Sequence, residues 1–269
     1  MFEILALYTE EADHSRSPVT NKAHAARIAA HAAKYRASDA RACASHFVKD
    51  ARGKFAVGTI NRSLGCLRRG LHLAWERGIT RDDYSSQVKA LPEHNARETH
   101  LSVEQVSTLA NAASENVRAA IWIALLTGCR RGEVCQIAAA DIGAESILIR
   151  AGNTKTLKTR TVPIFPALRP WLGYLPLAIN FEGVKSGFRR AREAVGMPHV
   201  QYRDLRRSCG MLLLSLDVPL DVIRDVLGHA SIKTTETHYA HAIVGRQRAA
   251  MEKLGALTEM HQQPAPASK

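Results

Sequence analysis

The sequence predicts a mainly α-helical protein of the α+β class with one small antiparallel sheet. Apolar residues recur at helical spacing through most of the chain, and one stretch at 146–164 instead has β-branched residues on both sides of a Gly-Asn pair. A polar segment with a proline at 80–99 separates two helical regions. We therefore expect a helical domain at 1–90, a linker at 91–100, an α+β domain at 101–257 and a disordered tail at 258–269.

The clearest helix of the first domain is TINRSLGCLRRGLHLAWERGIT, at residues 59–80. Thr59 is the expected N-cap and Gly78 is the expected stop. Its apolar stripe is predicted to consist of Ile60, Leu64, Leu67, Leu71 and Trp75. Arginines occupy the other faces, and both solvation and contact with nucleic acid are consistent with them: Arg62, Arg68 and Arg69.

The second domain is expected to begin with a helix capped by Ser102 and Gln105. The apolar run that follows breaks at Thr127-Gly128, where a new helix starts. SILIRAGNTKTLKTRTVPI then predicts an antiparallel hairpin or a three-stranded sheet. Helical patterns follow at 181–196, 201–218 and 219–229. Four residues within the predicted helices are expected in the core: Trp122, Leu212, Leu213 and Leu214.

Charge is the strongest signal in the composition. Thirty-seven Lys and Arg against 25 Asp and Glu give a formal net charge of +12, which favours a polyanionic partner such as nucleic acid. The five cysteines form no CxxC pair, which argues against a disulfide framework or a zinc knuckle. No apolar run is long enough to cross a bilayer. We expect a cytoplasmic protein with no membrane segment and no cofactor or metal.

Several basic residues are placed to bind a phosphodiester. Arg130 follows the helix break and would lie at a helix N-terminus, where backbone N–H groups also favour an anion. Arg203 and Arg206 are three residues apart and share one helix face. A lysine in the hairpin can donate a proton to a leaving oxygen, and both Lys155 and Lys158 are candidates for that role.

A candidate nucleophile lies in LGHASIKTTETHYAH, residues 227–241. The hydroxyl of Tyr239, beside a phosphate neutralised by arginines, can act as a covalent nucleophile. His229, at a helix end, can hydrogen-bond the phosphate oxygen as its negative charge grows. A zinc site formed by His229, His238 and His241 is the alternative, but no HExxH motif or cysteine pair accompanies these histidines.

Five motifs in this order, TGCRRGE, TKT, RDLRR, LGHASIKTT and THYAH, resemble the catalytic domain of the tyrosine recombinase family, the phage integrase type, over about residues 100–245. The N-terminal helices resemble, more loosely, the core-binding domain of that family. The resemblance implies a site-specific DNA recombinase or integrase that works through a 3′-phosphotyrosyl intermediate without metal or ATP. It also implies the catalytic set Arg130, Lys155, Arg206 and His229, with Tyr239 as nucleophile.

One position departs from the family pattern. Arg203 stands where the family usually has a histidine, and a guanidinium can donate to the phosphate but cannot accept a proton at neutral pH. We expect Arg203 to act as a cationic donor, and Glu133 to orient Arg130 through an ion pair. For Arg131 and Arg207, the second members of the doubled arginines, phosphate contact and solvation are equally consistent.

The partners implied by the resemblance are double-stranded DNA and further copies of the chain. A homotetramer on DNA is expected to form through the amphipathic segment AIVGRQRAAMEKLGAL, residues 242–257, with possible accessory DNA-bending proteins. The expected setting is a mobile element in a bacterial or phage-infected cell. Two alternatives stay open: a DNA-binding protein of the same fold with weak or lost cleavage, and DNA relaxation like that of a type IB topoisomerase.

Overall fold

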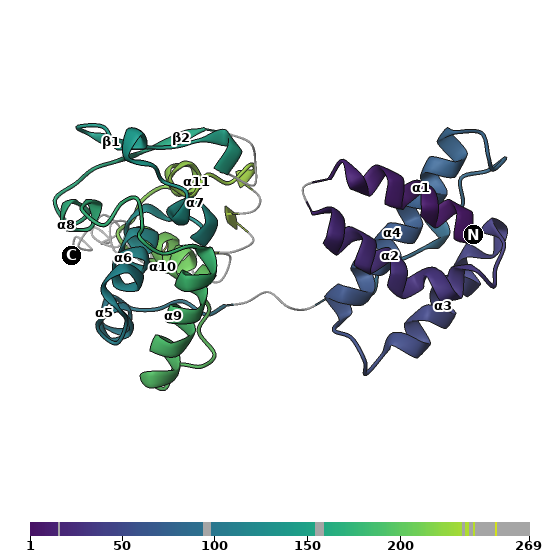
Figure 1. The fold of residues 1–269 in the computed structure, drawn as a ribbon, viewed down its shortest axis with the longest axis horizontal. Coiled ribbons are helices and arrows are strands. Elements are labelled where there is room, and N and C mark those ends of the chain that lie inside the picture. Colours follow the sequence, from purple (N-terminus) through teal and green to yellow (C-terminus); the bar gives the residue numbers. More distant parts are fainter. Residues whose placement is uncertain are drawn as a thin grey trace, which may run out of the picture. The chain divides into compact units, whose positions relative to one another are not determined.

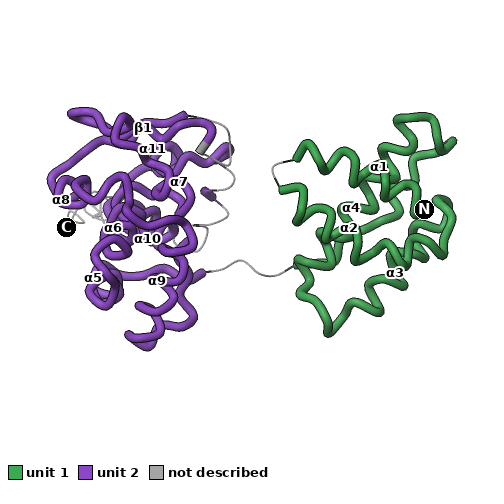
Figure 2. The backbone as a smooth tube through the Cα atoms, in the orientation of Figure 1, with its two compact units in different colours: residues 1–95 green, residues 96–269 purple. Residues whose placement is uncertain are grey.

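The chain folds into two compact units, Met1–Asn95 and Ala96–Lys269 (Figure 2). The computed structural model describes residues 1–15, 17–93, 98–153, 159–232, 235–236, 239 and 251. Each unit has its own buried core, and Figure 1 shows the elements of each. The predicted fold class is confirmed: the described residues form helices and one two-stranded antiparallel sheet. None of the described helices is long and apolar enough to span a membrane.

Unit 1 is helical. It consists of α1 (Phe2–Asp13), α2 (Pro18–Ala32), α3 (Ala40–Ala51) and α4 (Val57–Glu76), with short 3-10 turns at Ala37–Asp39 and Tyr84–Gln87. Helix α4 packs against α1 and α2. The apolar stripe predicted for this helix is buried at Ile60, Leu64, Leu67 and Leu71, which form the middle of the core.

Two details of α4 differ from the prediction. The helix begins at Val57 with Ala56 as N-cap, so Thr59 already lies within the first turn, where its N–H donates to the Ala56 carbonyl at 2.8 Å. Trp75 is 44% exposed instead of buried. It lies in the last turn of α4, where its ring packs beside that of His72 at a centroid distance of 5.5 Å.

The first part of the polar segment that follows α4 packs against this helix. Val88 is buried, and Leu91 exchanges two hydrogen bonds with the side chain of Asn61, at 2.8 and 3.0 Å. The Nε of Arg68 donates to the Val88 carbonyl at 2.8 Å. These contacts hold the segment against α4, so the ordered part of unit 1 extends at least to Leu91.

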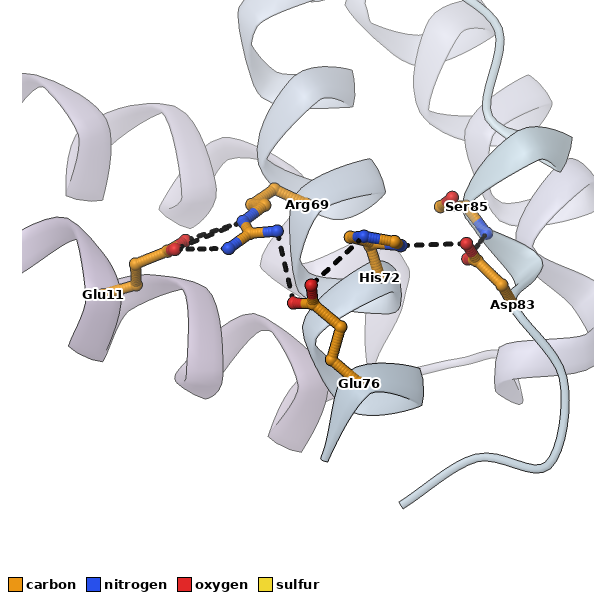
Figure 3. Close-up of polar contacts among 6 residues, drawn as sticks. All are labelled: Glu11, Arg69, His72, Glu76, Asp83 and Ser85. Atoms are coloured by element: carbon orange, nitrogen blue, oxygen red, sulfur yellow. Dashed lines mark hydrogen bonds and ion pairs between the residues drawn. The ribbon is translucent and has the colours of Figure 1, made fainter. Parts of the chain in front are cut away.

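A polar network joins α1, α4 and the segment after α4 (Figure 3). Arg69 forms ion pairs with Glu11 at 2.6 Å and with Glu76 at 3.3 Å. His72 lies 3.4 Å from Glu76 and 2.9 Å from Asp83. The hydrogen bond from Arg69 holds the pKa of Glu11 below its ordinary value. Arg69 therefore contributes to the packing of unit 1.

Unit 2 is built around α6. Its helices are α5 (Val103–Asn111), α6 (Glu115–Thr127), α7 (Arg131–Cys135), α8 (Arg169–Leu172), α9 (Phe181–Ala194), α10 (Tyr202–Ser215) and α11 (Leu220–Leu227), with 3-10 turns at Ala139–Asp141 and Ala151–Asn153. Helix α6 packs against α5, α9 and α10. Strands β1 (Ser146–Ile149) and β2 (Arg160–Pro163) pair antiparallel, with Ser146 opposite Pro163 and Ile149 opposite Arg160.

Several local predictions for unit 2 are confirmed. Ser102 and Gln105 form the expected capping box, and α6 ends at Gly128 in the left-handed conformation (φ +64°). The Gly-Asn pair does not join the strands directly, because it lies in the 3-10 turn Ala151–Asn153 and the strands first pair at Ile149 and Arg160. In the two units together, all five cysteines are free thiols, and four of them are buried.

The expected core positions are only partly buried. Leu214 is buried, but Leu212 and Leu213 are half-buried, because they turn to other faces of α10 and pack at the margins of two different apolar clusters. Trp122 is also half-buried and stacks on Trp171 at a centroid distance of 5.9 Å. Its place beside another indole agrees with a packing role.

Candidate active site

Arg130 is held in place by Glu133. The left-handed turn at Gly128 ends α6 and directs the chain into α7, for which Arg130 is the N-cap. The carboxylate of Glu133 is buried and accepts two hydrogen bonds from Arg130, from its backbone N–H at 3.0 Å and from Nη1 at 2.6 Å. The expected ion pair between these two residues is therefore present, and it fixes the direction of the Arg130 side chain.

A second guanidinium reaches the same carboxylate. Nη2 of Arg160, at the start of β2, donates to Oε2 of Glu133 at 2.9 Å and to Sγ of Cys129 at 3.2 Å. The Arg160 side chain is only 11% exposed. Burial alone raises the pKa of Glu133, but the charges and hydrogen bonds of Arg160 and Arg130 outweigh it, so the pKa lies below its ordinary value. Sequence reasoning missed Arg160.

Arg206 adds a third guanidinium from α10. Its Nη1 donates to the Gly128 carbonyl at 2.9 Å, while its Nη2 is buried and meets no acceptor among the described residues. Burial, and then the charge of Arg130, lower the pKa of Arg206 to about 10, so it remains charged at neutral pH. One carboxylate cannot compensate three guanidinium groups, and a buried unpaired cation is costly. This arrangement is suited to binding an anion.

Arg203 faces a cleft beside this cluster. The cleft has a volume of about 520 Å³ and is lined by Arg130, Arg203 and Arg206, by Arg131, and by three cations of α9, namely Lys185, Arg189 and Arg192. No acidic residue lines it in the described part of the chain. The guanidinium of Arg131 lies 3.9 Å above the Phe181 ring. Arg207 does not line the cleft.

His229 follows the end of α11. Gly228 adopts the left-handed conformation (φ +62°) and terminates the helix after Leu227. Nδ1 of His229 lies 2.8 Å from the hydroxyl of Thr235, which is fully buried. His229 and Arg160 line a second pocket of about 440 Å³. Thr235, which sequence reasoning did not single out, thus fixes the imidazole that borders this pocket.

The Tyr239 phenol lies against α10. Tyr239 is 3% exposed, and a methyl group at Gly210 would lie only 1.9 Å from its hydroxyl oxygen, so the oxygen sits directly beside Gly210. Gly210 follows Arg206 by four residues, a rise of about 6 Å along one face of the helix. Burial, and then Cys209, raise the pKa of Tyr239 to about 12, although Arg206 lowers it. The phenol is therefore protonated at neutral pH in this position.

The structure thus brings Arg130, Arg203 and Arg206 together around the cleft, with Glu133 buried and paired with Arg130. His229 borders a second pocket, and Tyr239 packs on α10. Other predicted positions lie outside the described residues: Lys155, the competing Lys158, His238, His241 and nearly all of 242–257. In unit 1, Arg68 and Arg69 donate to protein acceptors.

Three potential metal ligands approach one another in one place within the described ranges. His31, His46 and Asp50 of unit 1 have ligand atoms within 4.8 Å of each other. The Nε2 atoms of the two histidines lie 3.0 and 3.4 Å from the same oxygen of Asp50. Direct histidine–carboxylate contacts thus account for this group, and it belongs to a different unit from the arginine cluster.

A buried arginine cluster beside a packed tyrosine defines a candidate phosphate-binding site. The profile of the phage integrase family matches residues 178–245. Tyrosine recombinase XerC of Corynebacterium glutamicum is 27% identical, over 67% of this chain and 74% of its own length. XerC of Mycobacterium tuberculosis is 32% identical over 47% of this chain, which spans half the length of that relative.

Solved structures share the fold at low identity. The lambda integrase (residues 75–356) dimer bound to a COC′ core site has a TM-score of 0.71 and 15% identity, covering 88% of this chain and 94% of the integrase chain. The Tn1549 transposon integrase, in complex with a circular intermediate DNA, has a TM-score of 0.69 and 16% identity, covering 93% and 99%. Residues 178–245 thus match the phage integrase family, and the chain is similar in sequence to tyrosine recombinases over the ranges given.

Proposed function

We propose that this protein is a site-specific DNA recombinase or integrase that cleaves and rejoins DNA strands through a 3′-phosphotyrosyl intermediate. The observation that supports this most directly is the convergence of Arg130, Arg160 and Arg206 near the single carboxylate of Glu133. The Tyr239 phenol packs against Gly210, one turn of α10 after Arg206. The uncompensated charge matches a phosphodiester, and the phenol supplies a nucleophile.

The proposed reaction exchanges one phosphoester bond for another. The phenolic oxygen of Tyr239 attacks phosphorus, the bond from phosphorus to the 5′ oxygen breaks, and the 5′ hydroxyl leaves with a proton. Arg130, Arg206 and His229 stabilise the negative charge that develops on the phosphate oxygens. Lys155 is proposed as the donor of the proton to the leaving oxygen. The reverse attack by a 5′ hydroxyl of a partner strand rejoins the DNA.

Arg203 is assigned a binding role in this scheme. Its guanidinium lines the cleft one helical turn before Arg206 and can donate to the phosphate, but it cannot accept the phenolic proton at neutral pH. That proton is therefore released to solvent water, and the burial that raises the pKa of Tyr239 to about 12 opposes this transfer. We expect deprotonation to limit the rate of cleavage near neutral pH.

Double-stranded DNA is the proposed partner. The cations that line the cleft are suited to phosphate contacts on both sides of the scissile bond, and Arg131 is already oriented by its stacking on Phe181. Arg207, and Arg62 of unit 1, are proposed as further phosphate contacts, whereas the internal contacts of Arg68 and Arg69 leave them less able to reach DNA. Assembly is proposed to be a homotetramer coupled through residues 242–257, with accessory DNA-bending proteins.

The test is covalent trapping on nicked suicide duplexes with a randomised sequence around the nick. Cleavage releases the short 5′-hydroxyl fragment between the scissile phosphate and the nick. This fragment diffuses away, so religation is prevented and the protein–DNA adduct accumulates. The adduct is then resolved on a denaturing gel. We expect an adduct with the wild-type protein and none with Tyr239→Phe, because only the phenolic oxygen is removed. Tyr174→Phe, a half-buried tyrosine of unit 2, is the matched control and is expected to form the adduct normally.

The same assay separates the alternatives. DNA binding without any adduct from the wild-type protein supports the binding protein that has lost cleavage. An adduct together with relaxation of supercoiled plasmid, but without exchange of labelled strands between duplexes, supports the topoisomerase-like activity. Strand exchange between two duplexes supports recombination.

Thr235→Val is expected to slow adduct formation about fivefold, because one hydrogen bond of roughly 1 kcal/mol orients His229. Valine keeps the shape of threonine and removes the hydroxyl. The measurement compares adduct formation rates for Thr235→Val, His229→Ala and the double variant. If Thr235 acts only through His229, the double variant is no slower than His229→Ala, and an additive loss would contradict this role.

A further inference from the structure

Arg160 contacts both sides of the candidate phosphate site. It lies at the first position of β2, between the Glu133 carboxylate on α7 and the Gly228–His229 turn after α11. Resting on the proposed function, we infer that Arg160 is a positioning residue for cleavage. It sets the distance between the Arg130 side and the His229 side of the bound phosphate.

The first contact fixes the Arg130 side. The two carboxylate oxygens of Glu133 have different donors. Oε1 accepts from Nη1 of Arg130, and Oε2 accepts from the Arg130 backbone N–H and from Nη2 of Arg160. The carboxylate is buried, so its orientation depends on these donors and not on water. Without Arg160, one carboxylate oxygen keeps only the backbone N–H, and the side chain of Arg130 loses part of its fixed support.

The second contact fixes the His229 side. A Cβ atom at Gly228 would lie 3.0 Å from Cδ, 3.1 Å from Nη1 and 3.3 Å from Cζ of Arg160. The backbone of the turn therefore rests on the guanidinium of Arg160. Because Gly228 also has a positive φ, glycine is favoured here both by conformation and by space. His229 is the next residue, so Arg160 packs against the turn that holds the imidazole in position.

Only arginine has the shape for both contacts. The guanidinium is planar, and it donates to Glu133 from one edge while the Gly228 backbone packs against its other atoms. Its Nε is buried and meets no acceptor in the described part of the chain. The ammonium of a lysine retains the charge but lacks the extended plane. Shape as well as charge is therefore needed at position 160.

The test compares Arg160→Met and Arg160→Lys with Arg150→Met. Arg150 lies at the other side of the same hairpin connection and pairs with buried Asp141, so its replacement also removes one arginine ion pair but leaves the site untouched. The rate of adduct formation at saturating DNA and the dissociation constant for DNA are measured separately. We expect Arg160→Met to slow the rate about 100-fold, as a small misplacement of reacting groups does. The loss of DNA affinity is expected to be much smaller, because the cations that line the cleft remain.

The control and conservative variants give the remaining expectations. Arg150→Met is expected to react at the wild-type rate, and Arg160→Lys to recover only part of the loss. If Arg160 acts through Glu133, the double variant with Glu133→Gln loses less than the product of the two single losses. Circular dichroism and thermal unfolding establish that each variant is folded before its rate is interpreted.

The outcomes separate this inference from the proposed function. A wild-type adduct together with an unchanged rate for Arg160→Met contradicts the inference and leaves the function standing. A loss that appears in DNA affinity instead of the rate, or full recovery by Arg160→Lys, also contradicts it. A wild-type protein that forms no Tyr239-dependent adduct contradicts the proposed function itself.

Discussion

Replacing Arg206 with methionine is expected to slow adduct formation by about 100-fold or more, the usual effect of removing one donor to a developing oxyanion. Nη2 of Arg206 is buried and has no acceptor in the described residues, while Nη1 is held by the Gly128 carbonyl. The free donor is thus fixed in direction before any substrate binds. A phosphate oxygen that reaches it completes the hydrogen bonding of the guanidinium.

The same variant is expected not to lower the free energy of unfolding. Burial and the neighbouring Arg130 already disfavour the charged form of Arg206, and they lower its pKa to about 10. Removing this charge relieves repulsion among the three arginines and removes an unpaired buried donor. These two gains offset the loss of the hydrogen bond to Gly128, which contributes roughly 1 kcal/mol. Loss of activity with retained or increased stability is the signature of a group kept for function.

Thermal unfolding with and without sulfate measures both effects. Sulfate resembles the phosphodiester in charge and shape, and it is expected to raise the unfolding temperature of the wild-type protein but much less that of Arg206→Met. Arg169→Met is the matched control, because Arg169 is an exposed arginine of α8 that does not line the cleft. Equal stabilisation of wild type and Arg206→Met by sulfate would show that the cluster does not bind anions through this residue.

The parts of the fold that follow from short-range signals could be predicted from the sequence. The Ser102–Gln105 capping box and the Gly128 stop depend on residues within one helical turn, and both are present as expected. The docking of the segment after α4 could not be predicted, because it depends on contacts from Asn61 and Arg68 across 20 to 30 residues. From composition alone, a polar segment is expected to be exposed, because the sequence does not show which distant donors and acceptors will bind it.

The same division holds within the site. Glu133 is three residues from Arg130 on one helix, so their ion pair could be inferred from spacing alone. Arg160 lies 27 residues from Glu133 and reaches it only in the folded chain. The only signal for Arg160 in the sequence is its position directly after the lysine-bearing segment of the hairpin. Without the fold, it is one basic residue among many on a strongly basic chain.

Gly210→Ala is expected to slow adduct formation about 100-fold or more by displacing the nucleophile. The added methyl group would lie 1.9 Å from the Tyr239 oxygen and 2.5 Å from its Cζ. Both distances are far below van der Waals contact, so the ring must leave its present position. Alanine is otherwise favourable within α10, where glycine costs roughly 0.5 to 1 kcal/mol relative to alanine. The helix is therefore expected to persist while the phenol moves away from its place beside Gly210.

Titration of the phenol provides a direct measurement of that displacement. Burial raises the pKa of Tyr239 to about 12 in the folded protein, so a displaced, hydrated phenol is expected to titrate lower, toward its ordinary value of about 10. The difference in ultraviolet absorbance between each protein and its Tyr239→Phe partner isolates this one tyrosine. Gly65→Ala in α4, where nothing lies within 4 Å of the added methyl group, is the matched control and is expected to change neither quantity. If Gly210→Ala lowers the pKa yet forms the adduct at the wild-type rate, then the position of the phenol against α10 is not the one from which it attacks.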